Sequence, residues 1–253
     1  MSTNPANNPE WPQGYGCIAL ETVDSTMAEA ARLAGNIAQP TWVMARHQTA
    51  ARGRRGRPWV NPRGNLAATL IYHPFCTPEV AAQRSFVAAN ALLETLALYV
   101  DRTKLALKWP NDVLLNGGKV AGILLETSGN GPFVNWLSVG IGVNLREVPQ
   151  GVQDAAFQPV SLKAESGHLV SRAEFMTHLA GAFATQERKL EKFGFDRIRA
   201  DWLKHAAKLG EQINAVTPTE VITGLFDTID KDGNLVLITA KGPRTIRAAD
   251  VHF

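Results

Sequence analysis

The sequence of 253 residues is poor in the features that mark disulfide-rich, secreted and membrane-spanning proteins. Its two cysteines, Cys17 and Cys76, are too few and too far apart for a disulfide scaffold or a four-cysteine zinc site. Residues 1–13 are polar and lack the apolar core of a signal peptide. No window has the apolar length of a membrane span. These absences predict a soluble protein of the reducing cytoplasm that does not bind a membrane.

Histidine pairs, internal repeats and charged faces are also scarce. None of the six histidines is paired at the spacing of metal ligands, so no permanently bound metal is expected. The net charge is only +3, and much of the positive excess lies in one arginine-rich stretch. Such local basicity favours a small anionic ligand over a long polyanion, because a polyanion usually needs an extended basic face.

The arginine-rich stretch, residues 48–59, reads Gln-Thr-Ala-Ala-Arg-Gly-Arg-Arg-Gly-Arg-Pro-Trp. Its four arginines, Arg52, Arg54, Arg55 and Arg57, are not expected to fold inward, because an unpaired buried guanidinium loses its hydration without compensation. They must face water or an anion. Planar guanidinium forks suit phosphate and carboxylate. Taken alone, the stretch fits either an anion-binding loop or a solvated basic loop or nucleic-acid patch.

Hydrophobic periodicity predicts strands alternating with helices, then a change of pattern near residue 209. A capping box, Thr26-x-x-Glu29, is expected to start the first helix. Strands are predicted at residues 17–20, 42–46, 65–72, 105–109, 113–115, 120–126 and 133–143. Helices are predicted at residues 27–33, 78–100, 171–192 and 196–207, and a loop at 147–159.

The last part of the chain contains only short β runs. They lie at residues 213–216, 221–229, 235–239 and 245–246, and they fit a small SH3-like β-barrel. The predicted organisation is a flexible segment (1–14), a large domain (15–209) and a small C-terminal domain (210–253).

Polar residues gather where the middle strands end. Residues 110–112 are expected to interrupt the strand at 105–109 before it continues at 113–115. Lys108, Asn111, Asp112 and Lys119 then lie at strand ends or beside a tight turn, where their side chains can converge on a ligand held by rigid elements.

Three stretches, taken together, resemble the signature blocks of biotin protein ligases. They are Arg-Gly-Arg-Arg-Gly-Arg-Pro-Trp at 52–59, Lys-Trp-Pro-Asn-Asp at 108–112 with Lys-Val-Ala-Gly-Ile-Leu-Leu-Glu at 119–126, and Gly-Ile-Gly-Val-Asn at 140–144. Ser25, Thr26 and Gln48 also fall where that family has the same residue types. The resemblance extends from about residue 20 to the end of the chain. It implies an α+β fold of the class II synthetase type, with a mixed sheet backed by helices and an SH3-like C-terminal barrel.

The resemblance also implies a two-step reaction. The family joins biotin to ATP, used with Mg²⁺, which gives biotinyl-5′-adenylate and pyrophosphate. It then passes biotin to a lysine of the biotin carboxyl carrier domain of a carboxylase. When a carboxylate attacks an α-phosphate, two anions meet, so fixed cations must offset their repulsion. Arg52 and Lys119 are the best candidates for these cations.

Roles for individual residues follow from the same resemblance. The implied biotin site consists of Ser25, Thr26, Gln48, Arg52, Gly53, Lys119, Gly122 and Gly140. The implied nucleotide site consists of Arg54, Arg55, Arg57, Trp59, Lys108, Asn111 and Asn144. The implied catalytic residues are Arg52, Lys119 and Asp112. Asp112 could orient the incoming lysine or help to hold Mg²⁺, and the sequence leaves both roles open.

The sequence departs from the family pattern at two positions. Ala51 stands where the loop commonly has a first glycine, and Met27 replaces the usual Asn after Ser-Thr. The chain before residue 20 is too short for the helix-turn-helix domain of regulatory members, so we expect no repressor activity and no specific DNA binding. An exposed strand edge could support a homodimer or serve a carrier domain, which leaves monomer and homodimer open.

Two other functions compete with this interpretation. Lipoate or octanoate ligases and transferases share a similar fold, but their fatty ligands do not need the polar set of Ser25, Thr26 and Gln48. A nucleic-acid-binding module would explain the basic loop. It would leave Lys108, Asp112 and Lys119 unexplained, and it lacks aromatic residues interleaved with the charge.

Overall fold

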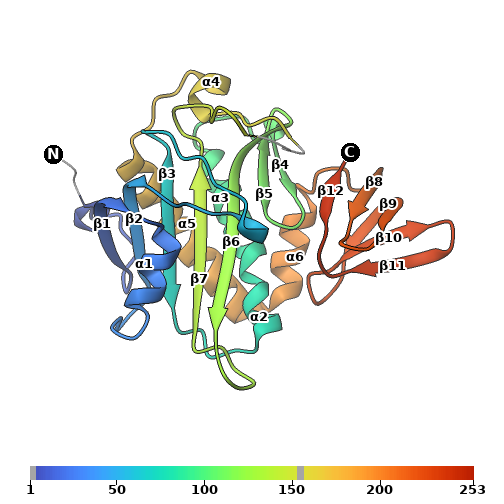
Figure 1. Cartoon of the computed structure of the whole chain (residues 1–253), viewed down its shortest axis with the longest axis horizontal. Helices are drawn as coiled ribbons and strands as arrows, with labels where there is room; N and C mark the ends of the chain where they lie inside the picture. The colour runs from blue at the N-terminus through green and yellow to red at the C-terminus, as the bar shows by residue number, and fades with distance from the viewer. Residues whose placement is uncertain (1–3, 153–156) are drawn as a thin grey trace.

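A computed structural model describes residues 4–152 and 157–253. Its centre is a mixed seven-stranded sheet in the order β1-β2-β3-β7-β6-β5-β4 (Figure 1). Only the pair β1–β2 is parallel among these neighbours. The strands are β1 (Gly16–Val23), β2 (Thr41–Gln48), β3 (Leu66–Tyr72), β4 (Leu105–Lys108), β5 (Asp112–Leu115), β6 (Gly118–Ser128) and β7 (Trp136–Val143). The predicted α+β fold with a mixed sheet is thus confirmed.

Alternation along the central strands gives the sheet two different apolar faces. Trp42 and Leu70 point to the main core, where the Trp42 ring meets Phe183 at a centroid distance of 5.6 Å. Their neighbours Val43 and Ile71 point to the opposite face and pack with the first helix. The helices are α1 (Thr26–Leu33), α2 (Pro78–Ala82), α3 (Arg84–Leu96), α4 (Leu162–Ser166), α5 (Arg172–Phe193) and α6 (Phe195–Leu203).

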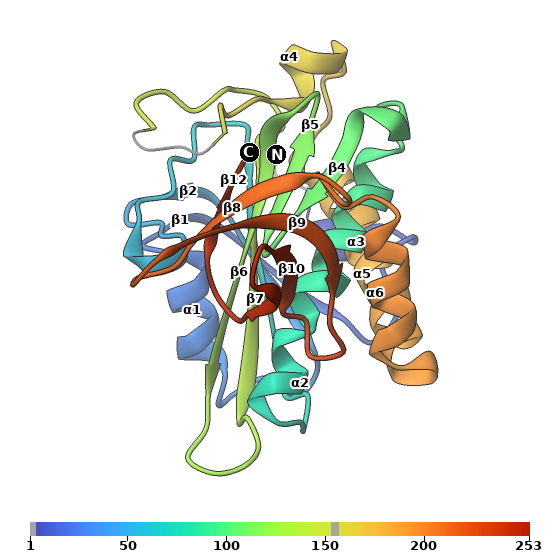
Figure 2. The same cartoon turned by 90° about the vertical axis from the view of Figure 1, so that its right-hand side faces the viewer.

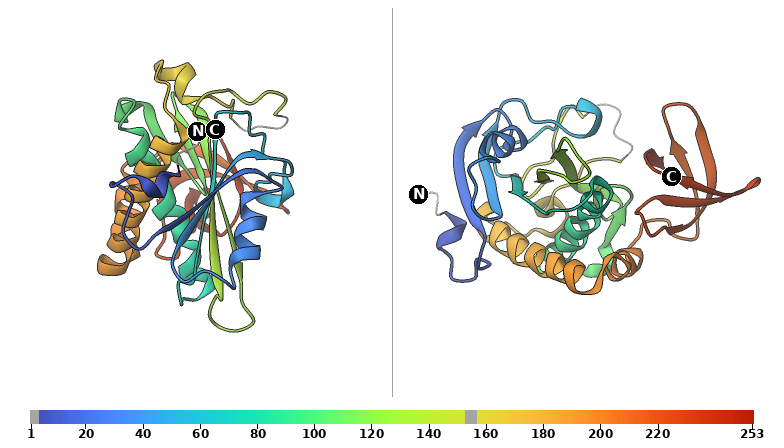
Figure 3. Two further views of the ribbon diagram at one scale, coloured as in Figure 1. Left: turned by 90° about the vertical axis from the view of Figure 1, so that its left-hand side faces the viewer. Right: turned by 90° about the horizontal axis from the view of Figure 1, so that it is seen from below.

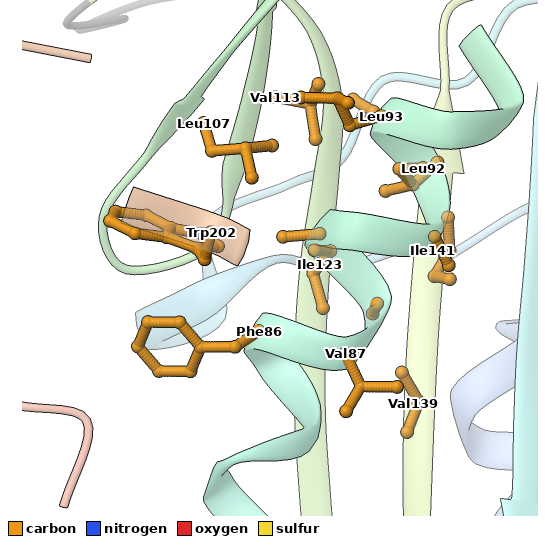
Figure 4. Close-up of a cluster of buried hydrophobic side chains, with 14 of the residues drawn as sticks. Phe86, Val87, Leu92, Leu93, Leu107, Val113, Ile123, Val139, Ile141 and Trp202 are labelled. Atoms are coloured by element: carbon orange, nitrogen blue, oxygen red, sulfur yellow. The ribbon is translucent and has the colours of Figure 1, made fainter. Parts of the chain in front are cut away.

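The main core lies between the sheet and helices α3, α5 and α6. Figure 3, on the right, shows α5 and α6 in orange along one side of the sheet. Figure 4 shows Val87 of α3 beside Val139 of β7, while the ring of Phe86 points to the side of Trp202 of α6. This face of the sheet is filled mainly by aliphatic and aromatic side chains.

Three local predictions need correction. The helix predicted at 78–100 is divided into α2 and α3: at the junction the Val80 carbonyl accepts from the main-chain N–H of Gln83 (3.3 Å) and from the guanidinium of Arg84 (2.9 Å), and α3 ends at Leu96. The N-cap of α1 is Ser25, whose Oγ accepts from Met27 N, and not Thr26. Residues 109–111 do not interrupt one strand: they reverse the chain, so that β4 and β5 pair antiparallel with Lys108 opposite Asp112.

The C-terminal residues form a separate five-stranded antiparallel sheet in the order β11-β10-β9-β8-β12 (Figure 2). Its strands are β8 (Gln212–Val216), β9 (Val221–Ile229), β10 (Leu235–Thr239), β11 (Gly242–Ile246) and β12 (Asp250–His252). The predicted small β-domain is confirmed, and β12 is an addition to the prediction. Trp109 Nε1 donates to the Gly233 carbonyl (3.0 Å), so the β4–β5 turn is tied to this domain.

The N-terminal segment and the predicted loop 147–159 are each described only in part. Residues 4–14 of the N-terminal segment include the short 3-10 helix η1 (Pro5–Asn7), in which Pro5 is buried; residues 1–3 lie outside the described part. In the predicted loop 147–159, residues 153–156 also lie outside it. The domain limits at 14/15 and 209/210 stay predictions. Across residues 4–152 and 157–253, no helix has both the length and the apolar character needed to cross a membrane.

One polar pair lies inside the main core. Arg84 Nη2 of α3 is 2.8 Å from Glu187 Oε1 of α5, and both side chains are 8% exposed. Tyr72 Oη also donates to Glu187 Oε1 (3.4 Å). Burial raises the pKa of Glu187 above its ordinary value, although Arg84 lowers it in part. The pair therefore fixes α3 against α5 at a desolvation cost.

We expect Arg84→Ala to reduce the free energy of unfolding by roughly 3–5 kcal/mol, because it leaves a buried carboxylate without its partner. Arg102→Ala is the matched control, since Arg102 pairs with Glu94 on the surface, where such a pair contributes at most about 1 kcal/mol. Urea unfolding of both variants measures the difference. Equal losses would show that the buried pair has no special importance.

Candidate functional site

A cavity of about 730 Å³ lies over the face of the sheet that carries α1. Its walls are the start of α1, the arginine stretch, the β4–β5 hairpin and β12 of the C-terminal domain. Every residue predicted for the site lines it: Ser25, Thr26, Gln48, Arg52, Gly53, Arg54, Arg55, Arg57, Trp59, Lys108, Asn111, Asp112, Lys119, Gly122, Gly140 and Asn144. The structure thus brings together residues spread over 120 positions of sequence, while their individual roles stay predictions.

One end of the cavity is an ordered polar cluster. The main-chain N–H and the hydroxyl of Thr26 both donate to Gln48 Oε1, at 2.8 and 3.1 Å. Thr69 Oγ1 of β3 donates to Thr26 Oγ1 (2.9 Å). Because Ser25 and Thr26 are almost fully buried, these bonds fix the orientation of the Gln48 amide before a ligand arrives. Sequence reasoning missed Thr69, which sits inside an apolar strand.

The floor of the cavity is made of backbone. A Cβ at Gly142 would lie 2.5 Å from Trp59 Cε2, and a Cβ at Gly140 would lie 2.5 Å from Met27 Sδ. At Gly122 it would meet the Trp59 ring at 3.1 Å. The glycines of β6 and β7 therefore let the Trp59 indole lie directly on the sheet. Gly142 belongs to the predicted 140–144 block, although it was not among the predicted site residues.

The arginine loop, Ala51–Trp59, is held by contacts between its own two ends and by contacts with the C-terminal domain. Its ends are joined by the Arg52–Pro58 bridge and by Trp59 N donating to Ala51 O (3.0 Å). At its tip Arg55 has a left-handed backbone (φ 56°), which is uncommon for a residue with a side chain.

Three loop arginines converge on one carboxylate. Arg55 Nη1 and Arg57 Nη2 each lie 2.8 Å from Asp250 Oδ2, and Arg54 Nη1 lies 3.8 Å from Oδ1. Burial raises the pKa of Asp250, but the hydrogen bond from Arg57 and the charges of Arg55, Arg57 and Arg54 outweigh it, so the pKa falls below the ordinary value. In this structure the three arginines thus contact a carboxylate of the protein itself, in β12, and their role at the nucleotide stays a prediction. No sequence signal singled out Asp250.

Arg52 points away from this cluster. Its Nη2 donates to both oxygens of Glu126 in β6, at 3.0 and 2.8 Å, and its Nε donates to Oε1 at 3.2 Å. Both side chains remain partly exposed. Arg52 is therefore a guanidinium held in a fixed direction at the cavity wall. Glu126 was part of the 119–126 block without an assigned role.

Two lysines share Asp112 on the opposite wall. Lys119 Nζ lies 2.6 Å from Asp112 Oδ1, as a close ion pair rather than a well-aligned hydrogen bond, and Lys108 Nζ lies 3.5 Å from Oδ2. Burial lowers the pKa of Lys108, against the opposing effect of Asp112. Lys119 Nζ also lies 5.4 Å above the Trp59 ring. The carboxylate thus places two cations beside the glycine floor.

The two asparagines mainly hold main-chain groups. Asn111 Nδ2 donates to Ile123 O (2.6 Å), and its Oδ1 accepts from Arg54 Nη1 (3.4 Å). Asn144 is buried, and its Nδ2 donates to Lys119 O (3.4 Å). Asn111 therefore connects the arginine loop to β6, and Asn144 supports the backbone that carries Lys119.

The described residues offer no ready metal site. Among residues 4–152 and 157–253, no group of three or more His, Cys, Asp or Glu side chains could hold an ion. Both oxygens of Asp112 face lysine ammonium groups, an arrangement that suits positioning of cations better than metal ligation. A contribution of Asp112 to Mg²⁺ binding stays a prediction.

Comparisons with known proteins agree with this geometry. The sequence pattern of the biotin/lipoate A/B protein ligase family matches residues 19–144, and that of the biotin protein ligase C-terminal domain matches residues 208–253. The chain is 51% identical to the biotin–[acetyl-CoA-carboxylase] ligase of Paracoccus denitrificans over 92% of its length and 99% of that protein. It is 32% identical to the bifunctional ligase/repressor BirA of Bacillus subtilis (strain 168), over 95% and 74%. The structure of the Aquifex aeolicus biotin protein ligase in complex with biotin and ATP is similar with a TM-score of 0.78 at 27% identity, over 93% and 97%.

We expect Gly142→Ala to lift the Trp59 ring from the floor, because the added methyl group would lie 2.5–2.7 Å from three ring atoms. Iodide should then quench tryptophan fluorescence more strongly than in the wild type. In a Trp59→Phe background the same substitution should leave quenching unchanged. An equal increase in both backgrounds would contradict the proposed contact.

Proposed function

We propose, because the chain belongs to the family of biotin protein ligases, that it is a biotin–[acetyl-CoA-carboxylase] ligase. It joins biotin to ATP to give biotinyl-5′-AMP and pyrophosphate, and it then transfers biotin to a lysine of a carboxyl carrier domain. The observation that carries this proposal is the single cavity that combines a fixed polar cluster, a glycine floor and six cations.

The polar cluster suits the ureido end of biotin. The Gln48 amide is already oriented by Thr26, so hydrogen bonding to a cyclic urea would need little reorganisation. The flat bicyclic ring would lie beside the backbone of β6 and β7, next to the Trp59 and Met27 side chains that pack against Gly122 and Gly140. The ligand carboxylate would then point toward Arg52 and Lys119.

Adenylation brings the biotin carboxylate to the α-phosphate of ATP. A carboxylate oxygen forms a bond to phosphorus as the bond to the leaving pyrophosphate breaks, and negative charge concentrates on the phosphate oxygens. Lys119 and Lys108 are placed to offset that charge, and Asp112 keeps both ammonium groups at one wall. Catalysis therefore depends mainly on positioning and electrostatics.

The nucleotide would lie between the arginine loop and the C-terminal domain. Arg54, Arg55 and Arg57 provide forks for phosphate, and Trp59 provides an aromatic face. Mg²⁺ would be held chiefly by the phosphate oxygens of ATP, as is usual for this ion. In the second step Asp112 could orient the acceptor lysine.

The same proposal implies a carboxyl carrier domain as the protein partner and a cytoplasmic location. Monomer and homodimer both remain predictions. The β4 edge of the large sheet is covered by residues 205–207, since Leu107 N donates to His205 O (2.7 Å) and Ala207 N to Leu107 O (2.8 Å). At the β1 edge, Asn4 Nδ2 donates to Cys17 O (3.3 Å). A second copy or a carrier domain could add a strand beside β1. The absence of specific DNA binding stays a prediction.

Pyrophosphate release from Mg-ATP tests the function directly. The protein is supplied separately with biotin, lipoate or octanoate and with no acceptor. Release with biotin alone is expected. Release with lipoate or octanoate instead would keep the fold and overturn the substrate, and no release with any of the three would overturn the proposed activity.

We expect Lys119→Gln to lower the rate of biotin-dependent pyrophosphate release about 10²–10³-fold, the usual cost of removing one group that stabilises transition-state charge. Lys241→Gln is the matched control, because Lys241 is exposed in the C-terminal domain and does not line the cavity. The measurement is the single-turnover rate at saturating ATP. A Lys119 variant that keeps the wild-type rate would remove this residue from the mechanism.

A further inference from the structure

Residues 109–111, which turn the chain from β4 into β5, are held by hydrogen bonds from two neighbouring elements. Ser85 Oγ of α3 donates to Pro110 O (2.9 Å). On the sheet side, Asn111 Nδ2 donates to Ile123 O (2.6 Å), and Ile123 N donates to Asn111 O (2.9 Å). The two residues that flank this turn line the cavity, so the position of the turn determines where their side chains lie.

A third contact on the β4–β5 turn comes from the C-terminal domain. Trp109 is 3% exposed, and its Nε1 donates to the carbonyl of Gly233 (3.0 Å), 124 residues away in the sequence. Gly233 lies in the turn between β9 and β10. Beside it, Arg199 of α6 donates from Nη1 to the carbonyl of Ile229, the last residue of β9 (3.2 Å). The β9–β10 turn is therefore bound to both the β4–β5 turn and α6.

The β9–β10 turn is fixed internally and packed against the large domain. Gly233 has a φ of +87°, and a Cβ at this position would lie 3.0 Å from Cε2 of Phe86 in α3. The side chain of Asp230 accepts from the main-chain N–H groups of Asp232 and Asn234, both at 2.9 Å. Burial raises the pKa of Asp230, but the hydrogen bonds from Asn234 and Asp232 outweigh it, so the pKa falls below its ordinary value. The Gly233 carbonyl is thus presented in one fixed direction.

We propose that Trp109 is a positioning residue through which the C-terminal domain fixes the cations on one wall of the cavity. Lys108, its neighbour in the chain, is 5% exposed, and its Nζ lies 3.5 Å from Asp112 Oδ2. Asp112 also holds Lys119, 2.6 Å from Oδ1. A shift of the turn between Lys108 and Asp112 therefore moves both ammonium groups together.

The inference rests on the proposed function for its effect on rate. The two ammonium groups offset charge that develops at the α-phosphate, so their displacement weakens the transition state more than the binding of either substrate. Loss of the Trp109–Gly233 contact should thus lower kcat and leave KM nearly unchanged.

Trp109→Phe tests the contact from the side of the large domain, because it removes the N–H donor and keeps an aromatic ring. The single-turnover rate of biotin-dependent pyrophosphate release should fall about tenfold, since a misplacement of about 1 Å costs up to the order of 10²-fold. KM for ATP and for biotin should change less than about twofold. Trp11→Phe is the matched control, because it removes an indole hydrogen bond to Tyr15 O (2.8 Å) in the N-terminal segment. A wild-type rate in Trp109→Phe, or an equal loss in Trp11→Phe, would overturn the proposal.

Gly233→Ala tests the same contact from the C-terminal domain, because the added methyl group would push the turn away from Phe86. It should reproduce the loss of rate in Trp109→Phe, and the double variant should be no slower than the slower single variant, since both remove one interaction. Gly242→Ala is the control: Gly242 has a φ of +102°, and a Cβ there would meet nothing within 4 Å. Losses that multiply in the double variant would show two independent effects and contradict the proposal.

Hydrogen exchange of the Trp109 indole separates this inference from the proposed function, because it needs no substrate. The indole N–H signal is identified by its absence in Trp109→Phe. It should exchange at least about tenfold faster in Gly233→Ala than in the wild type and in Gly242→Ala. Equal exchange in all three proteins would overturn the contact. Faster exchange in Gly233→Ala, in a protein whose wild type releases no pyrophosphate with biotin, would support the contact and contradict only the proposed function.

Discussion

The cations of the cavity have to be held apart from one another and still face the same ligand. Three carboxylates from three strands meet this requirement: Glu126 of β6 holds Arg52, Asp112 of β5 holds the two lysines, and Asp250 of β12 holds the other loop arginines. Each of these cations is therefore oriented by a carboxylate of the protein. Because six cations face three carboxylates, the cavity keeps a positive field suited to an anionic substrate.

This arrangement depends on a sheet whose two faces have different uses. The face toward α3 and α5 is filled by side chains such as Trp42 and Leu70, which hold the strands rigid. On the opposite face, where the cavity lies, the strands carry glycines at positions 122, 140 and 142. At these glycines Trp59 and Met27 pack directly against the backbone of the sheet.

Local patterns in the sequence were sufficient for most of the fold and for much of the site. Alternating residues predicted the strands, and the turn at 116–118 placed Lys119 next to the β5 strand that carries Asp112. The pattern was insufficient where distant contacts override local preference. Arg84, at the start of α3, pairs with Glu187, which is 103 residues away, and the hydroxyl of Thr26, the predicted N-cap, bonds to Gln48 and Thr69 instead. No local pattern in the sequence distinguishes Asp250 from a surface carboxylate, because only folding brings it close to the arginines.

The distance in sequence between the loop and its counter-ion has a consequence for how the protein is made. Arg55 is synthesised 195 residues before Asp250. At translation rates of about 5–20 residues per second, the loop waits roughly 10–40 s on the ribosome for its partner. During that interval Arg55 and Arg57 lack the carboxylate that they contact in the folded protein, whereas Glu126, the partner of Arg52, is made much earlier. The contact between the loop and β12 can therefore form only after nearly the whole polypeptide has been synthesised.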